Sequence, residues 1–513
     1  MYTSRRITGC GGILTADINI LKEENEMRKS FKRALALVLA MVMMLSLAAC
    51  GEKTEPTNAP TDAPKATEGV KETEAVTEAP TEAEDEYVLG SWAIAEDPKS
   101  ISGTVRFWIP FKGSQGMDDM IAAFNAIYPN ITVELNTYNN NTDGNMQVNT
   151  AIMMEEVDVL ASFGLHQTHS RWANDLFVDL TDYIEKYNID MVKEWGTDAY
   201  SYDGTYYTFP CGGLTYFVAI NMTAWNEAGL GELPTEWTWD EYLAASAAMT
   251  KKNADGSVAV YGGSDYSSIE YVSYPWYQVY GSDYVYSLDG KESNFTDTLI
   301  VNALEREIKA EQEDQIWFPL LTYRDNKVNH QDVFVVGNVA SVISCNLLRF
   351  IRDTENYPTD FVTGFAPYPV EEKGQDNHMA GVSSFSHAGI ASGCQDEEAA
   401  WAFLAWYSTY GVGYLPMAGH APTWKGTDTS NLINLIFGSE ENAAKLIDVD
   451  SFNNVLYNYD APVYVDTNTH ATSEVVALLK EYVMEAHRGN MSAEEAMAAA
   501  KELADEEIKK AMN

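Results

Sequence analysis

Residues 105–135, VRFWIPFKGSQGMDDMIAAFNAIYPNITVEL, contain the pattern that decides the fold class. The stretch at 105–109, apolar except for Arg106, reads as a short strand. Residues 117–128 carry apolar side chains at helical spacing, and the Pro-Asn pair at 129–130 ends that helix. Residues 131–135 then alternate as a second strand. A strand, a helix and a strand in this order predict a parallel α/β unit.

The length and charge of the chain narrow its class further. The chain has 513 residues, and the part after residue 86 is too long for one hydrophobic core, so we expect two lobes. Its formal net charge is −43, with 76 acidic residues against 33 lysines and arginines. This balance argues against nucleic acid or an anionic lipid surface as a partner of the globular part.

Residues 28–50 have the composition of a secretory signal. The uncharged apolar run at 34–47 suits a signal peptide but is shorter than the ~20 residues of a membrane-spanning helix. Four cationic side chains precede it: Arg28, Lys29, Lys32 and Arg33. The stretch ends in Leu-Ala-Ala-Cys, which resembles the bacterial lipobox, whose cysteine receives a diacylglycerol. The sequence predicts lipidation of Cys50, with an ordinary signal peptide or a signal anchor as the alternatives.

The position of this signal determines how we interpret the segments before and after it. Signals begin close to the initiator, so we interpret residues 1–26 as a mis-assigned start and 27–49 as the signal peptide. The stretch 50–86, after the lipidation site at its first residue, is rich in threonine, glutamate, alanine and proline. Such a composition predicts a disordered tether, because it buries too little apolar surface to offset its ordering entropy.

The cysteines and histidines give no catalytic or metal-binding pattern. Beyond the tether, the chain has three cysteines, Cys211, Cys345 and Cys394. Their odd number and the lack of CxxC spacing fit buried thiols, although one pair could form a disulfide outside the cell. His166 and His169 lie in one predicted loop without a third partner, which is weak evidence for a metal. We therefore expect neither an enzyme nor a cofactor.

Motifs along the chain resemble those of the family 1 extracellular solute-binding proteins, relatives of maltose-binding protein that serve ABC importers. Residues 124–134 are similar to the family's "F…NPNIxVE" signature, and residues 234–241 to its "PxTWDE" motif. Further similar motifs follow in the family's order, at 203–210, 225–230, 334–340, 365–369, 398–404 and 489–496. The resemblance runs from about Ser102 to the C-terminus.

This resemblance implies a two-lobe periplasmic-binding-protein-like α/β fold of type II, with a central ligand cleft. The first lobe would comprise residues 87–211 and about 390–455, and the second 216–386 and about 460–513. The resemblance implies that chain segments cross between the lobes near 210–215, near 387–390 and somewhere around 453–465. Gly212 and Gly213 suit a hinge, since glycine tolerates changes of dihedral angle, and a simple tight turn explains them equally well.

Aromatic residues, at 12% of the chain, are the signal for a ligand. Sugars present apolar CH faces ringed by hydroxyls, so a sugar cleft needs flat rings together with polar partners. Such clefts lie beyond the carboxyl ends of strands in open sheets. The candidate ligand-binding residues are Trp108, Lys112, Phe163, His166, Tyr274, Trp276, Asn346 and Trp424. Each aromatic candidate has the alternative of a place in the core, and Asn346 stands where relatives often carry tryptophan.

Together these patterns predict a receptor that binds without chemistry. It would be a monomer anchored by lipid on the extracytoplasmic side of the cell membrane, with a Gram-positive surface favoured. It would capture a mono- or oligosaccharide and deliver it to the permease of an ABC importer. Two alternatives stay open at this point: a secreted glycan-active enzyme, and a binding protein for a peptide or a polyamine.

Overall fold

The computed structural model describes residues 87–197, 200–202, 204–266, 268–466 and 470–512. All of them belong to the compact unit Asp85–Asn513. The predicted start, signal peptide, lipidated Cys50 and tether lie outside the described residues, so those predictions remain predictions. Among the described residues, no helix is long and apolar enough to cross a membrane.

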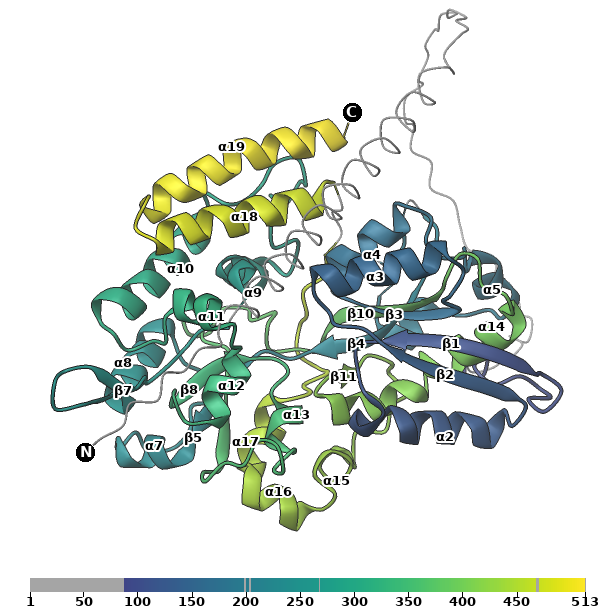
Figure 1. Cartoon of the computed structure of the whole chain (residues 1–513), viewed down its shortest axis with the longest axis horizontal. Coiled ribbons are helices and arrows are strands. Elements are labelled where there is room, and N and C mark those ends of the chain that lie inside the picture. The colour runs from purple at the N-terminus through teal and green to yellow at the C-terminus, as the bar shows by residue number, and fades with distance from the viewer. Residues whose placement is uncertain (1–86, 198–199, 203, 267, 467–469, 513) are drawn as a thin grey trace, which may run out of the picture. The chain divides into compact units, whose positions relative to one another are not determined.

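A six-stranded sheet forms the core of one half of the molecule (Figure 1). Its strand order is β11-β4-β10-β3-β1-β2. Strand β1 pairs in parallel with β2 and β3, whereas β10 runs antiparallel to both β3 and β4. The strands are β1 Gly103–Ile109, β2 Ile131–Thr137, β3 Val159–Phe163, β4 Phe209–Leu214, β10 Ser383–Ile390 and β11 Ala421–Pro422.

The predicted strand-helix-strand unit is confirmed. Helix α2, Met117–Ile127, begins after Gly116. The φ of Gly116 is 95°, a value that glycine adopts at little energetic cost. Its buried residues are Met117, Met120 and Phe124, the positions that the helical spacing marks as apolar. The helices of this half are α3 Thr142–Met153, α4 Leu165–Trp172, α5 Thr181–Lys186, α6 Met191–Trp195 and α14 Glu397–Tyr407, with the short turns η1 Gly113–Gln115 and η4 Gly411–Ala418.

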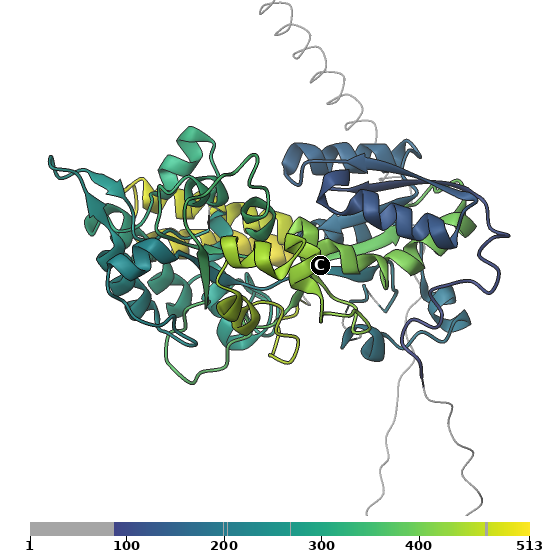
Figure 2. The same cartoon turned by 90° about the horizontal axis from the view of Figure 1, so that it is seen from below.

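The other half is built on a three-stranded antiparallel sheet with the order β8-β5-β9. Figure 2 shows the two halves side by side, seen from below. The strands are β5 Phe217–Asn221, β8 Ser341–Ser344 and β9 Thr363–Pro367, with the hairpin β6 Lys251–Lys252 and β7 Val258–Val260. The helices are α7 Met222–Glu227, α8 Trp239–Met249, α9 Tyr274–Tyr280, α10 Thr298–Ile308, α11 Leu320–Asn326, α12 His330–Val335, α13 Leu348–Ile351, α15 Leu432–Phe437, α16 Glu440–Leu446, α17 Val449–Val455, α18 Thr472–His487 and α19 Ala493–Ala511, with the turns η2 Ile269–Ser273 and η3 Lys309–Glu313.

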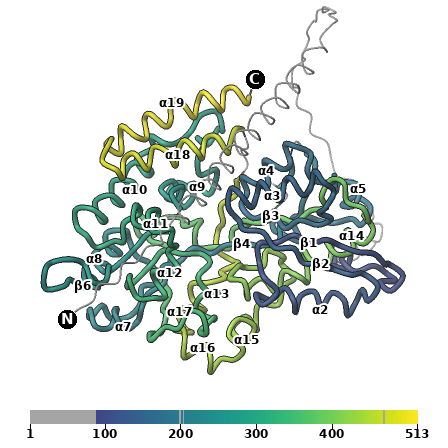
Figure 3. Tube along the Cα trace, in the orientation of Figure 1, coloured from purple at the N-terminus to yellow at the C-terminus, as the bar shows by residue number. Residues whose placement is uncertain are grey.

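The chain passes between the two sheets more than once (Figure 3). Strand β4 of the large sheet ends at Leu214, and β5 of the small sheet begins at Phe217. The chain returns between β9 and β10. Residues 432–456 pack in one hydrophobic cluster with Phe217 and Phe365 of the small sheet. The limits of the two lobes remain a proposal. Because of this packing, we assign residues 432–456 to the second lobe in that proposal, and no longer to the first.

Gly212 and Gly213 lie inside β4, where neighbouring atoms approach closely. A Cβ on Gly212 would lie 2.5 Å from Ser386 Oγ, and one on Gly213 would lie 2.6 Å from Val382 Cγ1. Neither glycine has a positive φ, so this close packing is sufficient to explain both residues. Their role as a hinge remains a prediction.

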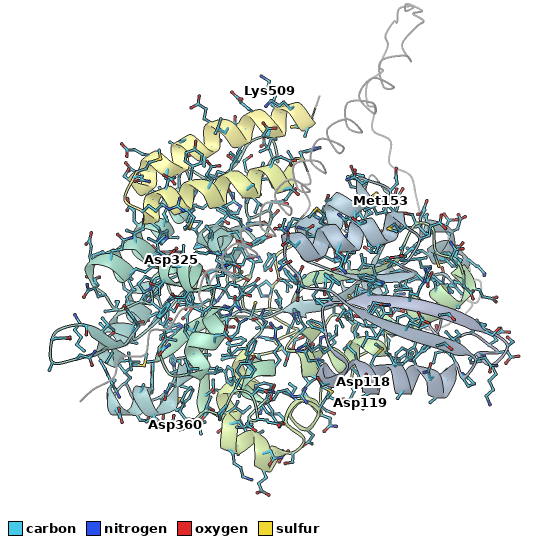
Figure 4. The ribbon with its side chains drawn as sticks, viewed as in Figure 1. Asp118, Asp119, Met153, Asp325, Asp360 and Lys509 are labelled. Atoms are coloured by element: carbon cyan, nitrogen blue, oxygen red, sulfur yellow. The ribbon has the colours of Figure 1, made fainter. Side chains whose placement is uncertain are left out.

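The surface reflects the acidic composition. Figure 4 shows Asp118 and Asp119 on α2, Asp325 on α11 and Asp360 before β9, and all four side chains are exposed. Exposed carboxylates keep the chain soluble and stay hydrated. Cys211, Cys345 and Cys394 are free thiols, the first two of them buried.

The last two helices dock onto the second lobe through a buried histidine. His487 Nδ1 on α18 lies 3.2 Å from Glu311 Oε2, and Nε2 lies 3.6 Å from Glu307 Oε2. Burial by itself would lower the pKa of His487, but the two carboxylates outweigh this effect and raise it to about 9. The imidazolium therefore stabilises the contact of α18 with α10 and η3.

We expect this contact to make stability depend on pH. A folded-state pKa raised to about 9 from 6.5 gives stability that is present below pH 6.5 and lost as the pH rises through about 9, on the order of 3 kcal/mol. Thermal unfolding measured from pH 6 to pH 9.5 checks this. His487→Gln should be less stable at pH 6 and should change less over this range. An equal change in both proteins would contradict the assignment.

Candidate functional site

A cavity of about 730 Å³ lies between the two sheets. From the large sheet, it is lined by the segments that follow three strands. The segment after β3 is helix α4, so His166 and His169 lie on a helix and not in the predicted loop. Pro110 and Lys112 come after β1, Asn140 comes after β2, and His166 comes after β3. The carboxyl ends of these strands meet at one edge of the sheet, which explains how residues far apart in the chain come to line one cavity.

Stacked aromatic rings form the opposite wall. Tyr266 lies between His330, at 3.9 Å between ring centroids, and Tyr271, at 4.0 Å, and Tyr271 stacks in turn on Tyr274 at 4.0 Å. Burial raises the pKa of all three tyrosines above 10, so their hydroxyls remain protonated and can both donate and accept hydrogen bonds.

Two further rings, Phe350 and Phe385, are half-buried and line the same cavity. Phe350 comes from α13, and Phe385 comes from β10 of the large sheet. Their remaining exposed area is apolar surface next to the cavity. Such surface is the kind on which the apolar face of a sugar or another flat ligand packs.

Side-chain amides supply the uncharged polar groups. Asn139, Asn140, Asn141, Asn145, Gln167, Asn329, Gln331 and Asn346 line the cavity. Gln331 Nε2 donates to Asn346 Oδ1 at 2.6 Å, and Asn346 Nδ2 donates to the hydroxyl of Tyr266 at 3.1 Å. These contacts fix the amide of Asn346 against the tyrosine stack, ready to orient a polar ligand.

Charged groups gather at two places in the cavity. Lys480 Nζ lies 2.9 Å from Glu270 Oε1, which forms an ion pair. Burial, then the nearby Asp283, raises the pKa of Asp466 to about 7, against the hydrogen bond that Tyr277 donates to it. Burial also keeps the lining histidines neutral, with the pKa of His166 lowered to about 4 and that of His420 to about 3.

Five of the eight predicted ligand-binding residues line the cavity: Lys112, Phe163, His166, Tyr274 and Asn346. Their role in binding remains a prediction. Phe163 is only 1% exposed, with its ring 4.9 Å from that of Phe111, so most of its surface serves packing.

Trp108, Trp276 and Trp424 do not line the cavity. Trp108 packs among Tyr138, Leu160 and other buried residues, and the ring of Trp276 packs on Tyr280 at 4.2 Å. The packing roles of these tryptophans follow from contacts between distant parts of the chain. For example, Trp424 donates its Nε1 hydrogen to Glu194, which also accepts from Trp92 at 2.7 Å.

Several lining residues are absent from the prediction made from the sequence. Arg349, Phe350, Phe385, Asp466 and Lys480 come from four different elements or loops, and no local motif marks them. The one local sequence pattern that points to the cavity wall is the excess of tyrosine around 271–277. Within the described ranges, no group of three His, Cys, Asp or Glu residues is arranged to hold a metal ion.

Comparisons with known proteins identify the family and the fold. A model of the family "Bacterial extracellular solute-binding protein" matches residues 111–413. A search of curated protein sequences finds no match to the chain.

Among solved structures, a sugar transporter protein from Rhizobium etli in an open conformation is 16% identical, with a TM-score of 0.61 over 80% of this chain and 99% of that one. An ABC substrate-binding protein from Listeria monocytogenes in complex with cycloalternan is 17% identical, with the same TM-score and coverage. A maltose-bound MalE protein of T. maritima is 17% identical, with a TM-score of 0.61 over 79% of this chain and 99% of that one.

At this level of identity, the solved structures establish the fold. They confirm the predicted two-lobe periplasmic-binding-protein-like α/β architecture. Because the family model covers more than half of the chain, this protein belongs to the bacterial extracellular solute-binding protein family.

Proposed function

We propose that this protein is a lipid-anchored receptor that captures a small saccharide outside the cell and delivers it to the permease of an ABC importer. The observation that carries the proposal is the cavity of about 730 Å³ between the two sheets, lined by aromatic rings and side-chain amides. This volume falls within the range of ~300–1,000 Å³ that small-molecule sites occupy.

The chemistry of the lining supports a saccharide. Half-buried Phe350 and Phe385 offer apolar surface to the CH faces of a sugar ring. The amides of Asn139, Asn140 and Gln167 offer donors and acceptors to its hydroxyls. Related structures described as complexes with cycloalternan, maltose and acarbose also support a sugar as the ligand.

Binding by lobe closure follows from the placement of the lining. Lys112 and His166 come from the first lobe, and Tyr274 and Asn346 come from the second, so one ligand would touch both lobes. A ligand that contacts both lobes favours the closed state by its differential affinity for it. The closed form would then present surface from both lobes to the permease, with no bond of the ligand changed.

The lipid anchor rests on the predicted signal. Cys50 would carry the diacylglycerol, and residues 51–86 would tether the receptor at the extracytoplasmic side of the membrane, with a Gram-positive surface favoured. A tether keeps the receptor close to the permease and so raises its effective concentration there.

A thermal-shift screen against mono- and oligosaccharides tests the ligand class. A ligand that binds only the folded protein must raise its melting temperature. Phe385→Ala should weaken the affinity of the best saccharide about five- to thirtyfold, because it removes stacking surface worth roughly 1–2 kcal/mol. Isothermal titration of the purified variant measures this loss.

Phe318→Ala is the matched control. Phe318 is also half-buried, packs on Tyr261 and Tyr323 and does not line the main cavity, so its loss should affect stability but not affinity. Equal loss of affinity in both variants, or a screen in which no saccharide raises the melting temperature, would contradict the proposal.

Cys50→Ala tests the anchor. Without the thiol no thioether to diacylglycerol can form, so the protein should move from the membrane fraction to the soluble or secreted fraction. Cell fractionation with metabolic labelling by a fatty acid measures both effects. Cys211→Ala is the control, since that buried thiol should leave labelling unchanged. Labelling that persists in Cys50→Ala would contradict the assignment of Cys50 as the lipidated residue.

A further inference from the structure

The charge of the cavity differs from that of the whole chain. The chain has 76 acidic residues and 33 lysines and arginines. The cavity lining instead contains three cations, Lys112, Arg349 and Lys480, against two carboxylates, Glu270 and Asp466. The cavity in which a ligand would lie therefore has a local excess of positive charge, although the chain as a whole is acidic.

The carboxylates of the cavity are already engaged. Glu270 pairs with Lys480 at 2.9 Å, and these two charges cancel. Asp466 accepts a hydrogen bond from Tyr277, and its pKa, raised by burial to about 7, leaves it partly neutral at physiological pH. Lys112 and Arg349 remain as the cations of the lining that no carboxylate of the cavity neutralises.

Arg349 is a strong donor group without an acceptor. Among the described residues its guanidinium takes part in no ion pair and no side-chain hydrogen bond, and its contact is with the ring of Phe350 at 5.1 Å. Burial lowers its pKa, and the groups that raise it again are Tyr266, Cys345 and Tyr357 rather than any Asp or Glu. Five N–H donors are thus available at the cavity wall.

His420 lines the cavity together with Arg349 and Lys112. The ring of His420 lies 5.0 Å from that of Phe111, the residue directly before Lys112. A Cβ on Gly419, the residue before His420, would lie 3.5 Å from the backbone nitrogen of Arg349, and burial, then the charge of Arg349, lowers the pKa of His420. His420 is 4% exposed, and its Nδ1 has no hydrogen-bond partner within the described part of the chain.

We propose that the saccharide bound here is acidic, with a singly charged anionic group, a uronate carboxylate or a sulfate ester, held by Arg349 and approached by Lys112. The inference rests on the saccharide function proposed above. A guanidinium binds such a group through two parallel N–H···O bonds, and a poorly solvated cavity strengthens this contact. Because Arg349 belongs to the second lobe and Lys112 to the first, the anion would also join the two lobes.

The test compares trisaccharides that are identical except at C6. One series carries a hydroxymethyl group, one a carboxylate and one a sulfate ester, each in the glucose and galactose forms, titrated into the purified protein by calorimetry. We expect at least one acidic form to bind tenfold or more tightly than its neutral counterpart. This preference should shrink between 50 and 500 mM NaCl, as an ionic contact requires.

Three variants connect the preference to Arg349. Arg349→Gln should reduce the ratio of acidic to neutral affinity to about one, whereas Arg349→Lys should restore part of it. Lys327→Gln removes an exposed charge outside the cavity and should keep the ratio unchanged. The melting temperature of each ligand-free variant confirms that it is folded.

The outcomes separate this inference from the function on which it rests. Neutral trisaccharides that bind as tightly as acidic ones overturn the inference and leave the saccharide receptor standing. Equal loss of neutral and acidic affinity in folded Arg349→Gln overturns it as well. Binding by no saccharide of any series overturns the saccharide function, and the inference with it.

Discussion

The position of β10 between β3 and β4 is the constraint on which the site depends. This strand returns from the second lobe and pairs antiparallel with both neighbours, Ala388 opposite Ala161 and His387 opposite Pro210. Ten residue pairs, five with β3 and five with β4, thereby fix β10 between its neighbours. Since β3 and β10 both reach the cavity, at Phe163 and Phe385, their register fixes how these two lining residues lie relative to each other.

The site is a polar and aromatic surface around a cavity. Its tyrosines are stacked and protonated, its histidines are neutral, and Glu270 is paired with Lys480. Each of these states lowers reactivity and fixes geometry, which suits recognition of a solute. The family to which the chain belongs is one of binding proteins.

The sequence predicts the helices and caps that depend on residues close together in the chain. The helix at Met117–Ile127 follows from its spacing, and the capping box of Thr238 with Glu241 begins α8 where the Thr-Trp-Asp-Glu motif indicates. The cavity is different, because proximity between distant residues creates it. Lys480 reaches Glu270 across 210 positions, and Trp424 is held by Glu194 across 230, so neither role leaves a mark in the neighbouring sequence. Of the predicted residues, the three tryptophans lie outside the cavity lining, whereas Lys112 after β1 and His166 after β3 belong to it.

The kinds of ring that line the cavity have a spectroscopic consequence. Tyrosine, phenylalanine and histidine line it, and in the described part of the chain the tryptophans lie elsewhere, in packed clusters. A ligand that enters the cavity without moving these clusters would therefore leave the long-wavelength emission of the indoles nearly constant. Its arrival would instead show in the ultraviolet absorbance of the phenols and in the near-ultraviolet dichroism of their stack.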